Sequence, residues 1–124
     1  MLSSRHRMRR SADFTAAVRR GARAGRSRLV VHVAAPEQSV GPDAQQVTVG
    51  FIVSRAVGNA AVRNRVKRRL RHLMRDRLGD VPAGSRVVVR ALPPAATATS
   101  SELASDLDGA LARSVSRLAS RSGS

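Results

Sequence analysis

The residues of this sequence best suited to chemistry are basic side chains at helical spacing. Four of them follow one another at intervals of four residues: Arg63, Lys67, Arg71 and Arg75. Like charges at this spacing lie on one side of a helix and destabilise it by roughly 0.2–0.5 kcal/mol per pair. Because Asp76 is the only acidic residue between positions 55 and 77, the pattern favours an anionic partner over the alternative of an ordinary solvated face.

Residues that could carry catalysis are scattered. His6, His32 and His72 are far apart, and none has a His, Cys or Glu partner at the spacing of a zinc site. Asp106 and Asp108 lie two residues apart in a predicted helix and so face different ways, which does not suit a two-metal nuclease. No phosphate loop, dinucleotide fingerprint or nucleophile elbow is present. We therefore expect no metal or cofactor held by the protein, and chemistry supplied by another molecule.

The composition restricts the class of protein. The 124 residues include 23 Lys and Arg against 8 Asp and Glu, with 42% hydrophobic residues, enough for one modest core. We expect a single domain over residues 1–120 and a disordered tail over residues 121–124. The absence of cysteine excludes a disulfide scaffold and a thiolate metal site. No apolar stretch is long enough for a signal peptide or a membrane span, so we expect a cytoplasmic protein without a membrane partner.

Positive charge is concentrated in two blocks. Residues 1–35 hold nine arginines and one aspartate, and residues 55–77 hold nine cations and one aspartate, so each block sums to +8 of the total of +15. All the cations except Lys67 are arginines, whose planar guanidinium matches phosphate geometry. Two basic blocks separated by foldable sequence indicate a surface that binds a polyanion.

The elements that position these residues follow from periodicity and turn signals. Six are predicted: a helix over residues 12–20 capped by Ser11, strands over 29–34 and 47–53, a helix over 60–78 capped by Asn59, a strand over 86–90 and a helix over 101–119. We expect the first two strands to pair as a hairpin. The fold class is therefore α+β, an α-β-β-α-β-α sandwich.

The predicted helix over residues 60–78 has two different sides. An apolar stripe is formed by Val62, Val66, Leu70, Leu73 and Met74, and the opposite side carries Asn64, Arg68, Arg71 and Arg75. The only aromatic residues of the chain are Phe14 and Phe51. Phe51 is predicted to be core, whereas Phe14 is either core, which its periodicity favours, or a partly open stacking surface.

One stretch resembles a known family. Residues 50–71, Gly-Phe-Ile-Val-Ser-Arg-Ala-Val-Gly-Asn-Ala-Ala-Val-Arg-Asn-Arg-Val-Lys-Arg-Arg-Leu-Arg, closely resemble the signature of the bacterial ribonuclease P protein component. The Arg63-Asn64-Arg65 triplet and the following Lys67-Arg68 and Arg71 are its most specific part. Residues 7–21 resemble the opening helix of the family, and the resemblance weakens after about residue 92.

The resemblance implies a protein subunit that joins a large catalytic RNA to remove the 5′ leader from precursor tRNA. The RNA subunit would hold the magnesium ions, and the partners would be that RNA and precursor tRNA, in a heterodimeric ribonucleoprotein that can dimerise further. Residues implied to bind the RNA subunit are Arg63, Asn64, Arg65, Lys67, Arg68, Arg69 and Arg71. Those implied to bind the leader, in a cleft between the first helix and the sheet, are Phe14, Val18, Val30, His32, Ile52, Arg55 and Ala56. Additional basic surface is implied at Arg7, Arg9 and Arg10.

The resemblance also carries expectations about fold and a departure from the family. The family forms a ribonuclease P protein-like sandwich, also found in a ribosomal protein domain, with a left-handed crossover between its second and third strands. Val18, His32 and Ala56 stand where relatives often carry Phe, Tyr and Lys, so leader contact here is expected to depend more on charge and less on stacking. The alternative is a ribosomal or nucleoid-type basic protein that binds nucleic acid without a role in cleavage.

Overall fold

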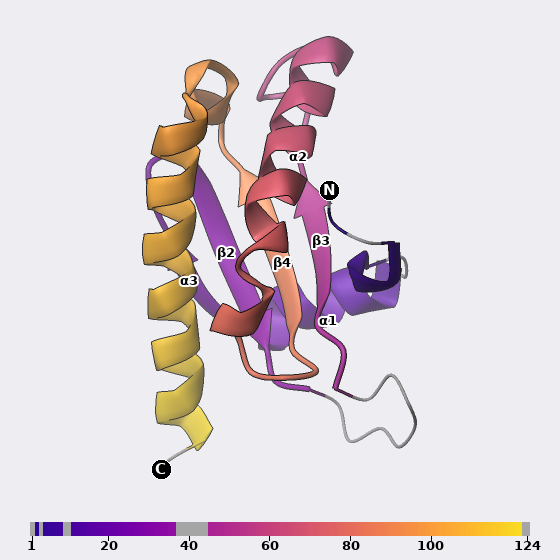
Figure 1. Ribbon diagram of the computed structural model, residues 1–124, viewed down its shortest axis with the longest axis vertical. Helices are drawn as coiled ribbons and strands as arrows, with labels where there is room; N and C mark the ends of the chain where they lie inside the picture. The colour runs from indigo at the N-terminus through magenta and orange to yellow at the C-terminus, as the bar shows by residue number, and fades with distance from the viewer. Residues whose placement is uncertain (1, 3, 9–10, 37–44, 123–124) are drawn as a thin grey trace.

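The computed structural model describes residues 2, 4–8, 11–36 and 45–122, which form one four-stranded sheet with helices on both faces (Figure 1). The helices are α1 (Ser11–Arg20), α2 (Ala60–Arg75) and α3 (Ser100–Ser122), and the strands are β1 (Ala22–Gly25), β2 (Leu29–Ala34), β3 (Thr48–Ile52) and β4 (Arg86–Ala91). Three short 3-10 helices complete the fold: η1 (Ser4–His6), η2 (Leu78–Asp80) and η3 (Pro93–Thr97). The α+β class predicted from the sequence is confirmed.

The strand order β1-β2-β4-β3 corrects the predicted hairpin. β2 and β3 do not pair with each other, because β4 lies between them, antiparallel to β2 and parallel to β3. The reason lies in β4, whose Val87, Val88 and Val89 are all completely buried. A strand that is apolar on both faces needs a helix layer on each side and a neighbouring strand at each edge, so it takes an interior position.

β1 is absent from the predicted order, which becomes α-β-β-β-α-β-α. Its sequence Ala-Arg-Ala-Gly has no β-branched residue, so propensity gives no signal. It forms because it continues directly from α1 and pairs antiparallel with β2 across a tight turn, closed by a hydrogen bond of 2.8 Å from Arg26 N to Leu29 O. Its buried Ala22 and Ala24 let α3 pack closely over it.

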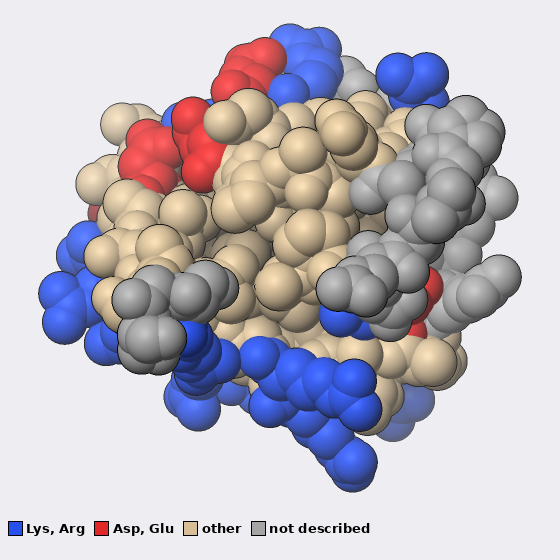
Figure 2. Space-filling model, turned by 90° about the horizontal axis from the view of Figure 1, so that it is seen from below, with Lys and Arg blue, Asp and Glu red and all other residues tan. Residues whose placement is uncertain are grey.

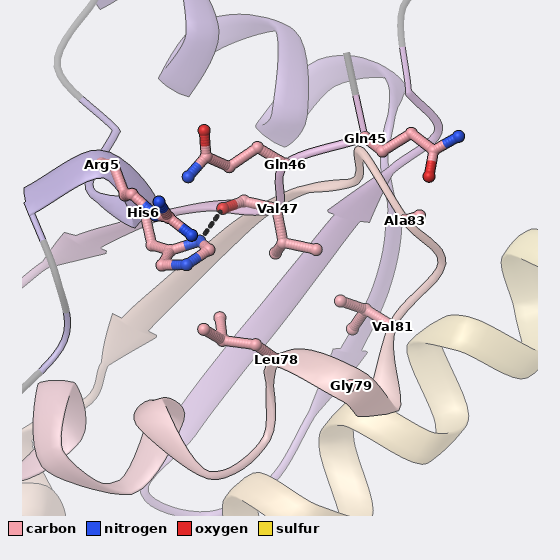
Figure 3. Close-up of a pocket in the computed structure, with 9 residues that line it drawn as sticks. All are labelled: Arg5, His6, Gln45, Gln46, Val47, Leu78, Gly79, Val81 and Ala83. Atoms are coloured by element: carbon pink, nitrogen blue, oxygen red, sulfur yellow. Dashed lines mark hydrogen bonds between the residues drawn. The ribbon is translucent and has the colours of Figure 1, made fainter. Parts of the chain in front are cut away.

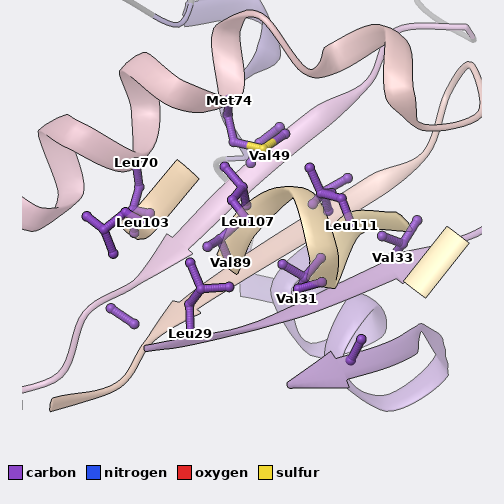
Figure 4. Packing of buried hydrophobic residues seen from close by; sticks show 14 of the residues in the cluster. Leu29, Val31, Val33, Val49, Leu70, Met74, Val89, Leu103, Leu107 and Leu111 are labelled. Atoms are coloured by element: carbon purple, nitrogen blue, oxygen red, sulfur yellow. The ribbon is translucent and has the colours of Figure 1, made fainter. Parts of the chain in front are cut away.

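The main core lies between the sheet and the two longer helices (Figure 4). The side chains that alternate toward this face include Leu29, Val31 and Val33 of β2, and α3 contributes Leu103, Leu107 and Leu111. From α2, Val66, Leu70 and Met74 are fully buried and Val62 and Leu73 pack at the margin, which confirms the predicted apolar stripe. Phe51, as predicted, packs against this core.

The opposite face of the sheet is covered by α1. A smaller core there contains Met8, Ala17, Ala34 and Val88, with Phe14 and Ile52 packed against it. α2 connects β3 to the parallel strand β4, and in Figure 1 it crosses in front of the sheet while β4 lies to the left of β3. This is the left-handed crossover that the family resemblance implies, an exception to the usual handedness.

Helix ends differ modestly from the prediction. Asn59 caps α2, its Oδ1 accepting the Val62 N–H at 3.0 Å, but the helix ends at Arg75 and the chain continues into η2. α3 continues through Ser122, so residues 121–122 are helical where a disordered tail was predicted, and residues 123–124 lie outside the described part. The last turn is held by a bond of 3.2 Å from Arg121 Nη1 to Arg20 O, a contact across the fold that local sequence does not indicate.

Candidate RNA interface

The outward side of α2 is a basic surface. Its apolar side is fixed in the core, so the remaining side chains must point away from the sheet. Asn64, Arg65 and Arg68 are exposed, and Arg63, Lys67, Arg69 and Arg71 are half-buried. These are the seven residues predicted to bind the RNA subunit, and all of them lie on this one helix.

Two of the seven also have structural bonds. Arg65 Nη2 donates to Ala96 O at 3.0 Å, and Arg69 Nη1 donates to Ala98 O at 2.9 Å. Both bonds connect α2 to the segment before α3. By contrast, the buried Nε atoms of Arg63 and Arg71 have no hydrogen-bond partner among the described residues. The Nε–H groups of these two guanidiniums are therefore unsatisfied within the described part of the protein.

Three cations meet an aromatic ring where α2 approaches the N-terminal segment. A hollow of about 150 Å³ is lined by Arg7, Met8, Phe14, Val49, Gly50, Phe51, Lys67 and Arg71. Residues 7 and 8 lie along β3, with a bond of 2.8 Å from Met8 N to Val49 O, and this places Arg7 beside Arg71. Burial and the charge of Arg7 both lower the pKa of Arg71. A hollow that unites clustered guanidiniums with a ring face suits a phosphate next to a nucleobase.

The ring of Phe14 lies directly over Gly50 of β3. A Cβ built at Gly50 would stand 2.5 Å from Phe14 Cζ, so only glycine leaves room for the ring. Phe14 is half-buried and packs against the smaller core, while Val18, one turn later in α1, is 39% exposed. Among the described residues no other large apolar side chain is that exposed. α1 therefore presents one partly open aromatic and one open aliphatic side chain on the side of the sheet that it covers.

The sheet face beside α1 carries the other predicted leader residues. Val30 and His32 are buried in β2, Ile52 is half-buried in β3, and Arg55 and Ala56 are exposed after β3. Neither ring nitrogen of His32 has a hydrogen-bond partner among the described residues. Burial, with Arg90 and Arg23 nearby, lowers the pKa of His32.

Arg23 and Arg90 were missed by the sequence analysis. Arg23 pairs directly with His32 across β1 and β2, and Arg90 pairs with Val30 and with Ile52 on either side of β4. Paired residues share a face of the sheet, so both arginines lie on the face that holds His32. Alternation within each strand could have found them, but only once the strand order was known. Of the predicted additional basic surface, Arg7 joins the hollow, and Arg9 and Arg10 lie outside the described residues.

A larger open hollow of about 740 Å³ lies near the N-terminus (Figure 3). Its described lining is Arg5, His6, Gln45, Gln46, Val47, Leu78, Gly79, Val81 and Ala83. His6 Nδ1 lies 2.8 Å from Val47 O, which engages that nitrogen. No carboxylate and no hydroxyl nucleophile stands among these residues, so they do not form an acid–base or nucleophile pair.

Basic and acidic side chains gather on different parts of the surface in Figure 2. Figure 2 shows Lys and Arg side chains gathered along the lower border of one end of the molecule, while the larger group of acidic side chains lies at the upper left. No cluster of three possible metal-ligating side chains occurs within the described ranges. In the same part of the chain, no helix is both long and apolar enough to cross a membrane.

Comparison with known proteins connects this geometry to a family. The family model for ribonuclease P matches residues 2–115, which include α1, the whole sheet, α2 and most of α3. The chain belongs to the ribonuclease P protein family. The resemblance seen in residues 50–71 is thereby confirmed over most of the chain.

Individual ribonuclease P proteins are similar in sequence and in fold. The chain is 57% identical over 116 residues to the ribonuclease P protein component of Streptomyces avermitilis, covering 91% of this chain and 94% of that protein. It is 58% identical over 120 residues to that of Thermobifida fusca, covering 94% and 80%. The Staphylococcus aureus RNase P protein structure matches with a TM-score of 0.74 at 24% identity, covering 89% of this chain and 97% of that one.

Proposed function

We propose that this chain is the protein subunit of ribonuclease P, binding the RNA subunit and the 5′ leader of precursor tRNA so that the leader is removed. The outward side of α2 would contact the RNA subunit, and the cleft between α1 and the sheet would hold the leader. The observation that carries this proposal is the hollow shared by Arg7, Lys67, Arg71 and Phe14. It contains residues of both predicted surfaces, so the RNA subunit and the leader would come close to each other there.

The proposal assigns the chemistry to the RNA subunit. In it the RNA holds the magnesium ions, and the protein alone is inactive. The protein would neutralise phosphates, which lets two RNA molecules approach each other, and would position the leader through Phe14 and the arginines around His32. Such contacts make affinity depend steeply on salt, with a slope of about −0.7 to −0.9 per neutralised phosphate. The proposal places this ribonucleoprotein in the cytoplasm.

A reconstitution assay tests the cleavage role. Precursor tRNA labelled at its 5′ end is incubated at low magnesium with a bacterial ribonuclease P RNA, with this protein, or with both. We expect the mature 5′ end to appear efficiently only when both are present. Binding of RNA without any effect on cleavage would instead support a basic nucleic-acid-binding protein of the ribosomal or nucleoid type.

A charge substitution tests the assignment of α2. Arg68→Ala removes an exposed guanidinium for which no structural bond is seen among the described residues, so it should reduce the salt slope of RNA-subunit binding by about 0.7–0.9. Arg5→Ala removes an exposed charge from η1, outside α2, and serves as the control. If both variants changed the slope equally, the RNA subunit would be responding to net charge and not to this helix.

A further inference from the structure

Charge is separated along α3. Residues 100–109 contain Glu102, Asp106 and Asp108, and residues 110–122 contain Arg113, Arg117 and Arg121. The charges of the two halves sum to zero, so the net charge of the helix does not reveal their separation. Because the three arginines are four residues apart, they form a single stripe on the helix.

The acidic half is already paired. Arg28 contacts Glu102 at 2.7 Å and Asp106 at 3.3 Å, and Arg77 contacts Asp108 at 2.6 Å. These ion pairs hold the turn before β2 and the segment after α2 against the first half of α3. No carboxylate of α3 is therefore left to neutralise the arginines of its second half.

Arg26, in the turn between β1 and β2, lies across from the stripe. A Cβ built at Gly109 would stand 2.7 Å from Arg26 Nε, so the guanidinium lies directly over the bare backbone of the helix. Together they line a groove of about 560 Å³, whose described lining is Arg26, Gly109, Ala112, Arg113, Ser116, Arg117 and Ser120. That lining contains three cations, two hydroxyls and no carboxylate.

Backbone bonds orient two arginines of the stripe. Arg117 Nη1 donates to Arg23 O, and Arg121 Nη1 donates to Arg20 O at 3.2 Å. Carbonyl oxygens orient a guanidinium but leave its formal charge uncompensated. Arg26, Arg113 and Arg117 form no ion pair within the part of the chain that the structure describes.

The groove lies at the edge of the sheet opposite to α2. α3 packs over β1 and β2, whereas α2 contacts β3 at the other end of the strand order. Three strand spacings of about 4.8 Å separate β1 from β3, and Figure 1 shows the two helices side by side in front of the sheet. A strand bound along the outward side of α2 would not reach this groove without crossing α3.

We propose that the groove between α3 and the β1–β2 turn is a second RNA-binding surface, which takes the backbone phosphates of an RNA segment separate from the one on α2. Guanidinium forks match phosphate oxygens, and the Ser116 hydroxyl adds a donor, whereas the Ser120 hydroxyl already donates to Ser116 O at 3.1 Å. No aromatic side chain is present in the described lining, so binding should be independent of base sequence. The choice of RNA among polyanions rests on the proposed function, while the presence of an anion site does not.

The test measures the salt dependence of binding by the full chain to ribonuclease P RNA, to precursor tRNA and to their complex. Arg26→Ala/Arg113→Ala removes two guanidiniums for which no structural bond is seen among the described residues, and should reduce the salt slope for at least one of these RNAs by about 1.4–1.8. Arg113→Lys keeps the positive charge, so this variant should retain most of the salt slope that Arg113→Ala removes. Arg5→Ala gives the effect of one charge removed elsewhere.

Gly109→Ala separates geometry from net charge. The added Cβ displaces the Arg26 guanidinium, keeps every charge and improves helix propensity, so the fold is retained. We expect weaker RNA binding from this variant at unchanged net charge. If Arg26→Ala/Arg113→Ala reduces the salt slope per removed charge no more than Arg5→Ala does, the groove on α3 is refuted as an RNA-binding surface. If Arg68→Ala still weakens RNA binding in the same experiments, the proposed function stands. Binding of polyglutamate or anionic vesicles through these arginines, without RNA, would refute RNA as the partner.

Discussion

The close approach of Phe14 to Gly50 makes Gly50→Ala an informative perturbation. A Cβ at this position would lie nearest to Phe14 Cε1 and 2.5 Å from Phe14 Cζ, while ordinary contact begins at 3.4 Å, so the ring must move by more than the ~0.9 Å that Cζ alone requires. Phe14 is half-buried and packs against the smaller core between α1 and the sheet. Movement of the ring therefore requires either a change of the Phe14 rotamer or a shift of the start of α1.

The expected cost follows from the overpacking. Forcing one extra methyl group into a packed contact costs about 1–3 kcal/mol. For a chain of this size, each kcal/mol lowers the melting temperature by roughly 3–5 °C. Under the proposed function, moving the ring also weakens stacking on the leader, worth about 1–3 kcal/mol per base. Affinity for precursor tRNA should fall, while affinity for mature tRNA should change little.

A double-mutant cycle with Phe14→Ala isolates the contact. The free energy of unfolding is measured in urea for the parent chain, both single variants and the double variant. If the clash with the ring causes the loss, Gly50→Ala should cost less than about 0.5 kcal/mol when the ring is absent. An equal cost in both backgrounds would refute the argument, since the strain would then arise elsewhere in β3.

Two further predictions concern groups fixed by the fold. Burial, together with the charges of Arg90 and Arg23, lowers the pKa of His32 below its ordinary 6.5. As the pH falls below 6.5, the unfolded chain therefore binds a proton at His32 before the folded protein does. The free energy of unfolding consequently falls as the pH falls across this window and rises as the pH rises. His32→Gln should lose less free energy of unfolding than the parent between about pH 7.5 and about pH 5, and equal losses would contradict this. Asn59→Ala removes the acceptor of the Val62 N–H and should cost about 1 kcal/mol in urea unfolding, whereas Asn59→Asp should retain the cap; similar losses from both would show that the cap contributes little.

Local signals were sufficient for α2. Its cap, its apolar stripe and its basic side follow from residues within one turn of each other, and the structure has all three. The family signature in residues 50–71 is equally local, which is why membership could be inferred from the sequence and then confirmed by the match over residues 2–115. The strand over residues 29–34 was likewise predicted from local composition, and β2 has the same bounds.

Strand pairing was not predictable in the same way. The sequence suggested a hairpin of β2 with β3, because neighbouring strands usually pair, but the all-valine centre of β4 requires the interior position. β1 carries no propensity signal and exists only because β2 and α3 are there to pair and pack with it. Both outcomes depend on contacts between residues distant in the chain.

The sequence alone predicted a helix with one apolar and one basic side that is suited to a polyanion, because charge and 3.6-residue periodicity are local properties. Tertiary structure alone decided that Arg7 and Arg71 meet around Phe14, and that Arg23 and Arg90 flank His32. It also decided that Arg26 faces the stripe on α3 across Gly109. Each of these juxtapositions depends on which strands are neighbours and in what register, and a one-residue shift would turn the side chains to the other face.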